Sequence, residues 1–510
     1  MSEPIDPGSR RAARDSANER TTALWVKPTV LEQTVTTTDA APERSGIGAV
    51  FAKHPQAWLA GGIAVVFLLL GTGAVMAGIA VGSRPTTPAA AAPGTATDEP
   101  VDPNREVPGT IPVATRLRTC SIATQAGAGS LGDLRGYVID TDSGQVLYSS
   151  SGTKAASPST VLGMATASAA ISALGPEFRM STTVYQGADP GSIVLVGGGD
   201  PTLSNTDPGQ QSVYRDAPKL SDLANQVNTA LAGAPVTSIT LDSTYWSSDD
   251  KWDSSWSRSL QTGGTLSEVT ALQVDGDRAD PTKQTSPRTT DPVMRAGELF
   301  AAKLGFPDAT LSLGAVPDGA AQIGEVKSQP LSALVNTMLQ SNDATLAEQL
   351  ARVTSLNLSM DGSAASVAKA IPQALGAIGL DTSGVVIRDG SGTSAKNSVS
   401  PKFVTRLVAK LLEGSSNLNY VYNSLPVGGK TGTLADRFTG DNKDAAASVN
   451  AATGSTSGGR SLAGTVKAED GTVLAFAFYA IKDNISTAAK GDLDAIVAGA
   501  YACGDNLASS

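Results

Sequence analysis

The residue types that could carry out hydrolytic chemistry are few in this chain. The only histidine is His54, so residues 55–510 contain no imidazole. A Ser-His-Asp triad and a histidine-ligated zinc site are therefore excluded from that part of the chain. The two cysteines, Cys120 and Cys503, are too few for a thiolate metal cluster. Any hydrolytic site must use lysine or carboxylate groups, and we expect no metal and no cofactor.

Two short patterns place a lysine near a hydroxyl group. Ser151 and Lys154 have the Ser-x-x-Lys spacing, in which a lysine can activate a serine. Their neighbours are Ser, Gly and Thr in a connection, so an exposed loop is the alternative interpretation. Lys430 begins a Lys-Thr-Gly sequence. It does not belong to a phosphate-binding loop, because Ser424 stands where that motif requires a glycine.

The composition indicates a chain of several parts without a nucleic-acid partner. A length of 510 residues exceeds what one compact core accommodates. The net charge is -10, and the chain lacks the clustered Lys and Arg residues that phosphate binding requires.

The N-terminal part predicts a membrane anchor. Residues 1–57 are polar and predict a disordered cytoplasmic tail. Residues 58–82 carry no charge and are long enough to cross a bilayer as a helix. An internal signal sequence and a buried core helix are the alternatives. Residues 83–112 are rich in Pro, Ala and Thr and predict an extended linker. Because Lys53 and Arg84 flank the span on opposite sides, charge barely decides its orientation.

The cysteines favour an extracytoplasmic location for the C-terminal part. Cys120 and Cys503 lie close to the two ends of the predicted globular region, where one disulfide would join those ends in an oxidising compartment. Two unpaired buried thiols are the alternative, because spacing alone does not establish a bridge.

The globular region shows strand patterns at both ends and helical patterns between them. A hairpin is predicted around Asp142, and an apolar helix over Ser159–Leu174 that stops at Gly175-Pro176. A second hairpin is predicted around Asp470. This arrangement predicts one α/β (α+β) domain.

A β-rich segment of residues 177–325 interrupts this domain, which comprises residues 113–176 and 326–510. The segment mixes short strand-like runs, SIVLVGGG and SITLD, with Gly, Pro and Asp clusters. Helical patterns return over residues 331–354 and 366–378.

A series of local sequences resembles the penicillin-recognising serine peptidases, specifically the PBP4-type D-alanyl-D-alanine carboxypeptidase/endopeptidase family (peptidase S13-like). In order they are DSGQVLYS, ALGPEFR, LVGGGDPTL, TALQVDGDR, LAEQLAR, DGSGTS, LPVGGKTGTLADRF and SLAGTV. The resemblance implies a penicillin-binding/beta-lactamase-like transpeptidase fold and acyl transfer on peptidoglycan stem peptides. It also implies three motifs: Ser-x-x-Lys on a helix, Ser-x-Asn, and Lys-Thr-Gly on a strand beside the closing hairpin.

The first implied motif is incomplete in this chain. Counting from the hairpin to ALGP places the nucleophile position at Thr160 and its lysine at Gly163. Glycine has no group that can accept the proton. The alternative nucleophile Ser159 has Leu162 three residues later, so neither alignment restores the pair.

The second and third implied motifs are also altered. The Ser-x-Asn positions are Asn342 and Ala344; a shift by one residue gives Ser341 but no asparagine. The Lys-Thr-Gly strand, expected about 20 residues after the LPV segment, reads Ala452-Thr453-Gly454. The literal Lys-Thr-Gly at Lys430 is then a chance match in an outer turn.

The sequence therefore favours a noncatalytic relative that binds peptidoglycan stem peptides or an envelope protein partner and is anchored by one helix. The rival interpretation is an active serine-type D-Ala-D-Ala carboxypeptidase that uses Ser151 and Lys154, or Lys430, in a rearranged site. A carboxylate-based wall hydrolase or an adhesion module is a third class, which the ordered family fragments disfavour.

Overall fold

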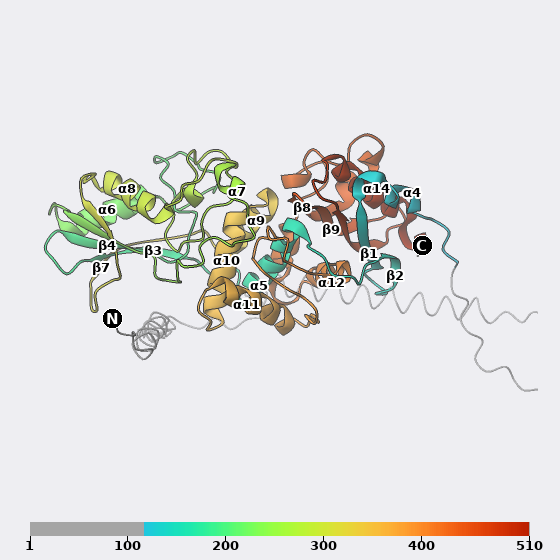
Figure 1. Ribbon diagram of the computed structural model, residues 1–510, viewed down its shortest axis with the longest axis horizontal. Coiled ribbons are helices and arrows are strands. Elements are labelled where there is room, and N and C mark those ends of the chain that lie inside the picture. Colours follow the sequence, from blue (N-terminus) through green and yellow to red (C-terminus); the bar gives the residue numbers. More distant parts are fainter. Residues whose placement is uncertain (1–116, 509–510) are drawn as a thin grey trace, which may run out of the picture. The chain divides into compact units, whose positions relative to one another are not determined.

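The computed structural model describes residues 117–508, and its main elements are drawn in Figure 1. The predicted tail 1–57, span 58–82 and linker 83–112 lie outside the described residues. Within residues 117–508, no helix is long and apolar enough to cross a bilayer.

The first sheet is antiparallel and joins the two ends of the described chain in the order β2-β1-β10-β9-β8. Both predicted hairpins are confirmed: β1 pairs with β2, and β9 with β10. Because β1 also pairs with β10, strands from the beginning and the end of the globular region lie side by side. The strands are β1 (Asp133–Asp140), β2 (Val146–Ser150), β8 (Val449–Thr456), β9 (Gly459–Lys467) and β10 (Val473–Ile481).

Both faces of this sheet are buried. Side chains of a strand alternate between its faces. Accordingly, Ala475, Ala477 and Tyr479 of β10 join a core with α12 (Pro401–Leu412), whereas Phe476 and Phe478 join a core with α14 (Ala488–Cys503). The run LAFAFYA is apolar at every position because β10 has a helix on each side.

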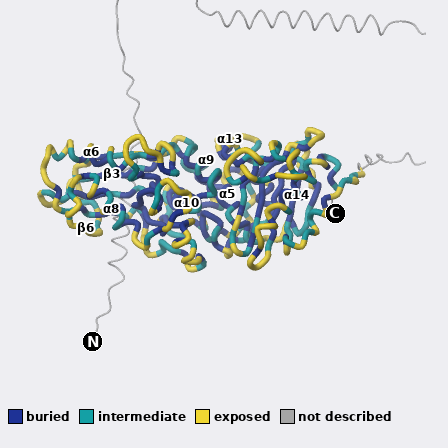
Figure 2. Tube along the Cα trace, turned by 90° about the horizontal axis from the view of Figure 1, so that it is seen from above, coloured by how far each residue is buried: buried dark blue, intermediate teal, exposed yellow. Residues whose placement is uncertain are grey.

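A group of buried helices packs beside the sheet. They are α5 (Gly163–Leu174), α9 (Leu331–Ser341), α10 (Ala344–Asn357) and α11 (Ala364–Ala377). In α5, only the last three residues are not fully buried, and α5 and α10 are dark blue over much of their length in Figure 2. The Ala-rich sequence of α5 allows its neighbours to approach closely on all sides.

One helix prediction needs correction. The pattern over residues 331–354 predicts a continuous helix, but the structure breaks it at Asn342 and Asp343. Asn342 adopts a left-handed conformation with φ of 55°, and the Asp343 side chain caps α10 by accepting a hydrogen bond from Leu346 N. Both residue types favour helix ends over helix interiors.

The inserted segment forms a second sheet, with order β6-β5-β4-β3-β7. Its strands β4 and β5 are the predicted SIVLVGGG and SITLD runs, but the segment also contains two long helices. The spacing of Leu220, Leu223 and Val227 places all three on one helix face. The elements are β3 (Ser181–Gln186), β4 (Ser192–Gly197), α6 (Leu220–Leu231), β5 (Ser238–Asp242), α7 (Ser259–Thr262), α8 (Pro292–Leu304), β6 (Thr310–Leu313) and β7 (Gln322–Lys327).

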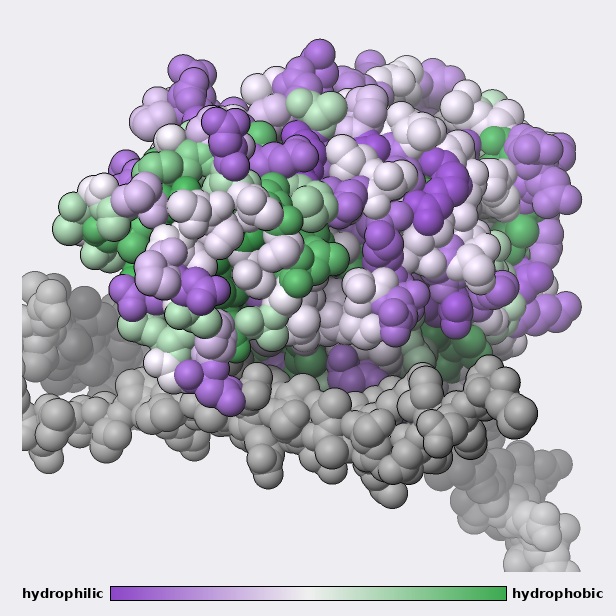
Figure 3. Space-filling model, turned by 60° about the vertical axis from the view of Figure 1, so that its left-hand side comes forward, coloured by the Kyte–Doolittle hydropathy of each residue, from purple (hydrophilic) through white to green (hydrophobic). Residues whose placement is uncertain are grey.

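The predicted disulfide is confirmed. Cys120 and Cys503 are bonded with their Cα atoms 5.4 Å apart, across a sequence separation of 383. The bond joins the segment before the short helix α4 (Ala123–Ala126) to the end of α14. The face of the molecule drawn in Figure 3 shows hydrophilic and hydrophobic residues intermixed.

Candidate functional site

Thr160 lies at the entrance of the buried helix α5. A 3-10 turn, Ser159–Leu162, precedes α5, and Ser159 at its start has a positive φ of 52°. Thr160 is only half-buried, whereas Ser159 is 1% exposed. The hydroxyl of Ser159 lies 3.2 Å from that of Thr456 and is enclosed. Of the two alternative nucleophiles at this turn, only Thr160 is accessible.

Three segments that are distant in sequence meet at the Thr160 hydroxyl. Asn342 Nδ2 donates to Thr160 Oγ1 over 2.7 Å, and the backbone N–H of Ser455 donates to it over 3.2 Å. The hydroxyl in turn donates to the carbonyl of Thr453 over 3.4 Å. We call Thr160, Asn342, Thr453 and Ser455 the Thr160 cluster. Both lone pairs of the hydroxyl and its proton are thus engaged by hydrogen-bond partners.

Gly163 leaves open space one helical turn beyond Thr160. A Cβ atom built at Gly163 would have no heavy atom within 4 Å. No lysine side chain of the described residues forms a hydrogen bond with Thr160 or Ser159. The structure therefore has room for a side chain at Gly163 but supplies no amine to Thr160 from elsewhere in the described chain.

The break between α9 and α10 brings Asn342 to the cluster. Asn342 has a left-handed conformation at the end of α9, and its side chain reaches Thr160. Ser341 donates to Thr337 O of its own helix over 2.7 Å, and Ala344 begins α10. Among Ser341, Asn342 and Ala344, the hydrogen bond to Thr160 comes from Asn342.

Strand β8 carries the third motif position. Ala452 pairs with Ala463 and Gly454 with Ser461 on β9. A Cβ atom at Gly454 would lie 2.9 Å from Ser159 Cβ and 3.0 Å from Pro158 O, so only glycine allows β8 to approach the start of α5 this closely. Ala452 is 4% exposed and has no polar side-chain atom. The strand thus contributes backbone groups and the Thr453 hydroxyl, which donates to Thr433 over 2.8 Å.

The remaining candidate residues lie in exposed turns. Lys430 is exposed in a turn in which its N–H donates to Val427 O over 3.1 Å. Ser151 and Lys154 form a turn after β2, with Lys154 exposed and its N–H bonded to Ser151 O over 2.9 Å. Among the described residues, none of these side chains has a hydrogen bond or ion pair with the Thr160 cluster.

A buried carboxylate pair supports the same region and was not assigned a role from sequence. Glu348 of α10 accepts from the N–H groups of Gly390 and Ser391 over 3.1 and 2.7 Å. Asp389 accepts from Gly392 N, Ser394 N, Asn397 Nδ2 and Trp256 Nε1. Burial, and then the neighbouring charge of Asp389, raise the pKa of Glu348 well above its usual range; burial likewise raises that of Asp389.

This pair anchors the DGSGTS loop, whose Gly392 has a φ of 81° and packs directly on the Ser159 carbonyl. The sequence signal for this carboxylate pair lies in the LAEQLAR and DGSGTS fragments. An acidic residue within an apolar or Gly-rich run indicates a buried carboxylate that needs hydrogen-bond partners.

Comparison with known proteins identifies the family. The model of the D-Ala-D-Ala carboxypeptidase 3 (S13) family matches residues 118–284 and 264–500. The chain belongs to this family. It is 32% identical to carboxypeptidase DacB of Mycolicibacterium smegmatis over 422 residues, which cover 82% of this chain and 89% of the relative. It is 29% identical to a carboxypeptidase of Mycobacterium tuberculosis over 78% of this chain and 87% of that protein.

The fold comparison agrees with the S13 family assignment. The crystal structure of penicillin binding protein 4 (dacB) from Haemophilus influenzae superposes with a TM-score of 0.61 at 18% identity, covering 74% of this chain and 97% of that chain. The mixed α/β penicillin-binding fold is thereby confirmed. Within this S13-family fold, Asn342 and Ser455 donate hydrogen bonds to the Thr160 hydroxyl, and no lysine of residues 117–508 forms a hydrogen bond with it.

Proposed function

We propose that this chain is a membrane-anchored cell-wall member of the S13 family that forms an acyl-enzyme poorly and binds peptidoglycan stem peptides or an envelope partner through the Thr160 cluster. The observation that carries the proposal is the hydrogen bonding of Thr160 Oγ1. It accepts from Asn342 Nδ2 and Ser455 N and donates to a carbonyl oxygen, whereas nucleophilic attack requires a base that takes the proton.

The altered motif positions support this proposal together. Gly163 and Ala452 replace the two amines that the family pattern implies, and Ala344 replaces an amide. Groups that act as one catalytic unit lose several orders of magnitude in rate when one of them is removed. The Asn342 NH2 group has a second N–H besides the one that donates to Thr160, and this N–H can donate to a peptide carbonyl, which suits binding without turnover.

Fluorescent penicillin tests the proposal on the full-length chain. We expect no stable covalent labelling at concentrations that label an active S13 enzyme run in parallel. Noncovalent binding of a stem peptide ending in D-Ala-D-Ala, followed by calorimetry, should weaken when Asn342 is replaced by alanine. Covalent labelling that disappears in Thr160→Val or Ser151→Ala would instead support an active carboxypeptidase and overturn the proposal.

The membrane anchor and the extracytoplasmic location belong to the same proposal. The uncharged residues 58–82 support the anchor, and the Cys120–Cys503 disulfide supports an oxidising compartment. We expect the full-length chain to resist alkaline extraction from membranes, and a chain lacking residues 1–82 to be released. Protease added to spheroplasts should digest the C-terminal part; protection of that part would contradict the orientation.

A further inference from the structure

We propose that Arg278, in the inserted segment, is a positioning residue for the Thr160 cluster: its buried ion pair with Asp343 fixes the direction of the neighbouring Asn342 side chain. The inference deepens the proposed function, since it rests on the Thr160 cluster being the binding site. It makes the inserted segment a part of that site, although none of the four cluster residues belongs to the segment.

Both oxygens of the Asp343 carboxylate have hydrogen-bond partners. Oδ2 lies 2.8 Å from Arg278 Nη2 and accepts from the Tyr214 hydroxyl over 3.1 Å; Oδ1 accepts from Leu346 N over 3.0 Å. Arg278 and Asp343 side chains are each 1% exposed. Burial acts to raise the pKa of Asp343, but the Arg278 charge and the Leu346 N–H bring it below the usual value. The carboxylate is therefore charged and cannot turn without leaving a buried guanidinium unpaired.

Asn342 depends on this anchor through the backbone. It is the single left-handed residue between α9 and α10, and Asp343 follows it directly. Asp343 is held from the inserted segment by Arg278 and from α10 by Leu346 N. With Asp343 fixed, the peptide plane after Asn342 is fixed too, and the Asn342 amide stays 2.7 Å from Thr160 Oγ1.

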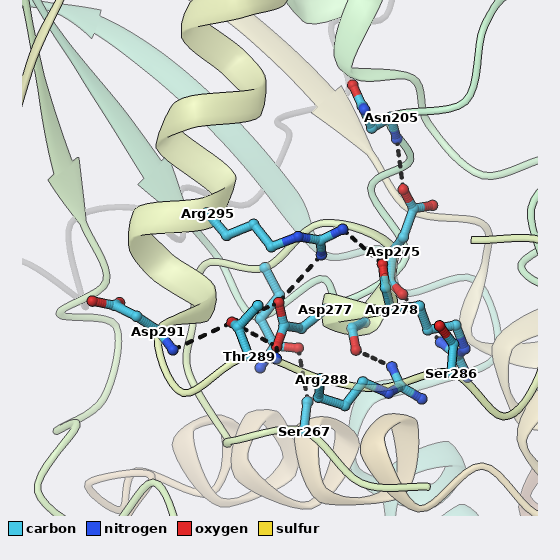
Figure 4. Close-up of polar contacts among 12 residues, drawn as sticks. Asn205, Ser267, Asp275, Asp277, Arg278, Ser286, Arg288, Thr289, Asp291 and Arg295 are labelled. Carbon is cyan, nitrogen blue, oxygen red and sulfur yellow. Dashed lines mark hydrogen bonds and ion pairs between the residues drawn. The ribbon is translucent and has the colours of Figure 1, made fainter. Parts of the chain in front are cut away.

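Arg278 is itself held by a strained turn, shown in Figure 4. Asp275, Gly276 and Asp277 have consecutive φ values of 54°, 57° and 62°, a conformation that is costly for the two aspartates. A Cβ atom at Gly276 would lie 2.7 Å from both Arg278 Nη1 and the Tyr214 hydroxyl, so this turn fits closely beneath the ion pair. Such strain persists only where surrounding contacts enforce it.

Further contacts enforce the turn. Arg295 of α8 pairs with Asp277 over 3.2 Å and donates to Arg278 O over 2.7 Å. The Arg278 guanidinium lies 4.7 Å from the ring centre of Tyr214, a cation–π contact. Contacts within the inserted segment thus fix both the backbone and the side chain of Arg278. They hold its guanidinium group in the direction of Asp343.

A cysteine at position 160 makes this positioning measurable. Since both native cysteines are in the disulfide, Thr160→Cys introduces the only free thiol of the chain. We expect hydrogen bonds from Asn342 and Ser455 to favour the thiolate and to hold the thiol pKa below the ordinary value of about 8.5. The pH dependence of the iodoacetamide reaction rate gives this pKa directly in the full-length chain.

We expect Arg278→Met in the Thr160→Cys background to raise the pKa of the introduced thiol by about one unit, as Asn342→Ala does directly. Tyr214→Phe removes only one hydrogen bond to Asp343, so it should raise the thiol pKa by less while keeping the fold intact. The matched control is Arg352→Met. Arg352 of α10 forms an ion pair with Asp250 of the inserted segment over 2.7 Å, in which the arginine is buried and the aspartate is 34% exposed, and it also donates to Gly362 O.

An unchanged thiol pKa in both Arg278→Met and Tyr214→Phe, with a raised thiol pKa in Asn342→Ala, would overturn the inference. An equal rise in Arg352→Met would overturn it as well, because general loosening would then explain the effect. No change in Asn342→Ala would show that Asn342 does not act on residue 160. Penicillin labelling of the native chain is a separate readout, so a failure of the proposed function is distinguishable from a failure of this coupling.

Discussion

Asn342 Nδ2 lies 2.7 Å from Thr160 Oγ1, across 182 residues of sequence. The amide donates a hydrogen bond and cannot accept the hydroxyl proton through the same atom. The Asn342 amide therefore stabilises the Thr160 oxygen and does not serve as its proton acceptor, while the space beside Gly163 is open.

Restoring a lysine to α5 should restore acylation. In Thr160→Ser/Gly163→Lys, the new amine would project into open space on the same helix face as the serine. We expect fluorescent penicillin labelling at least about 100-fold above that of the native chain, the lower end of what a general base contributes.

The matched control for the restored lysine is Thr160→Ser/Gly491→Lys. Gly491 lies in α14, and a Cβ atom there likewise has no heavy atom within 4 Å. This control should remain unlabelled. Absence of labelling in both double variants would contradict the idea that the missing amine limits acylation.

The Glu348–Asp389 pair should make stability depend on pH. Burial raises the pKa of Glu348 from 4.5 to about 8. The unfolded chain releases its proton from pH 4.5 upward while the folded chain retains it, so the free energy of unfolding should fall as pH rises from 4.5 to 8. Urea denaturation at several pH values measures this fall.

Glu348→Gln should flatten that pH dependence, because the titrating group and its repulsion of Asp389 are both removed. The free energy of unfolding of the variant should also be lower at pH 5 by about 1–3 kcal/mol. The two carboxyl oxygens of Glu348 accept hydrogen bonds from backbone N–H groups, and in glutamine an NH2 group, which is a donor, replaces one of these oxygens. Exposed Glu177→Gln serves as the control and should retain the native slope. An unchanged slope in Glu348→Gln would assign the pH dependence to other groups.

Gly392 should tolerate no side chain. A Cβ atom at this position would lie 2.1 Å from Ser159 O, and its φ is 81°. We expect Gly392→Ala to lower the free energy of unfolding by about 2–4 kcal/mol, from overpacking together with the left-handed conformation. Gly379→Ala is the comparison, because its φ is 89° but no heavy atom lies within 4 Å. Equal losses in the two variants would show that contact with Ser159 is unimportant.

Removing the disulfide should destabilise the domain without changing the Thr160 cluster. Cys120→Ser/Cys503→Ser frees the two ends of the described chain, and we expect a loss of about 2–5 kcal/mol in urea denaturation. Noncovalent stem-peptide affinity should be unchanged at a temperature where the variant is folded. A loss of less than about 0.5 kcal/mol would indicate that other contacts hold the ends.

Local patterns were enough to predict much of this protein. Alternation and turn residues predicted both hairpins, helical spacing predicted the α5 region, and the position of the cysteines predicted their bond. Ordered fragments located Thr160, Asn342 and Thr453, which the structure brings together. These features depend on neighbouring residues or on counting along the chain, and both are readable from the sequence.

Only the tertiary structure decided which partners these residues have. The hydrogen bond from Asn342 to Thr160, the ion pair between Arg278 and Asp343, and the packing of Gly392 on Ser159 join residues far apart in sequence. These contacts form only when the inserted segment and the helices pack together. In the packed state an unpaired buried charge or a steric clash costs free energy, so each buried group must meet a complementary partner. No local pattern encodes that selection.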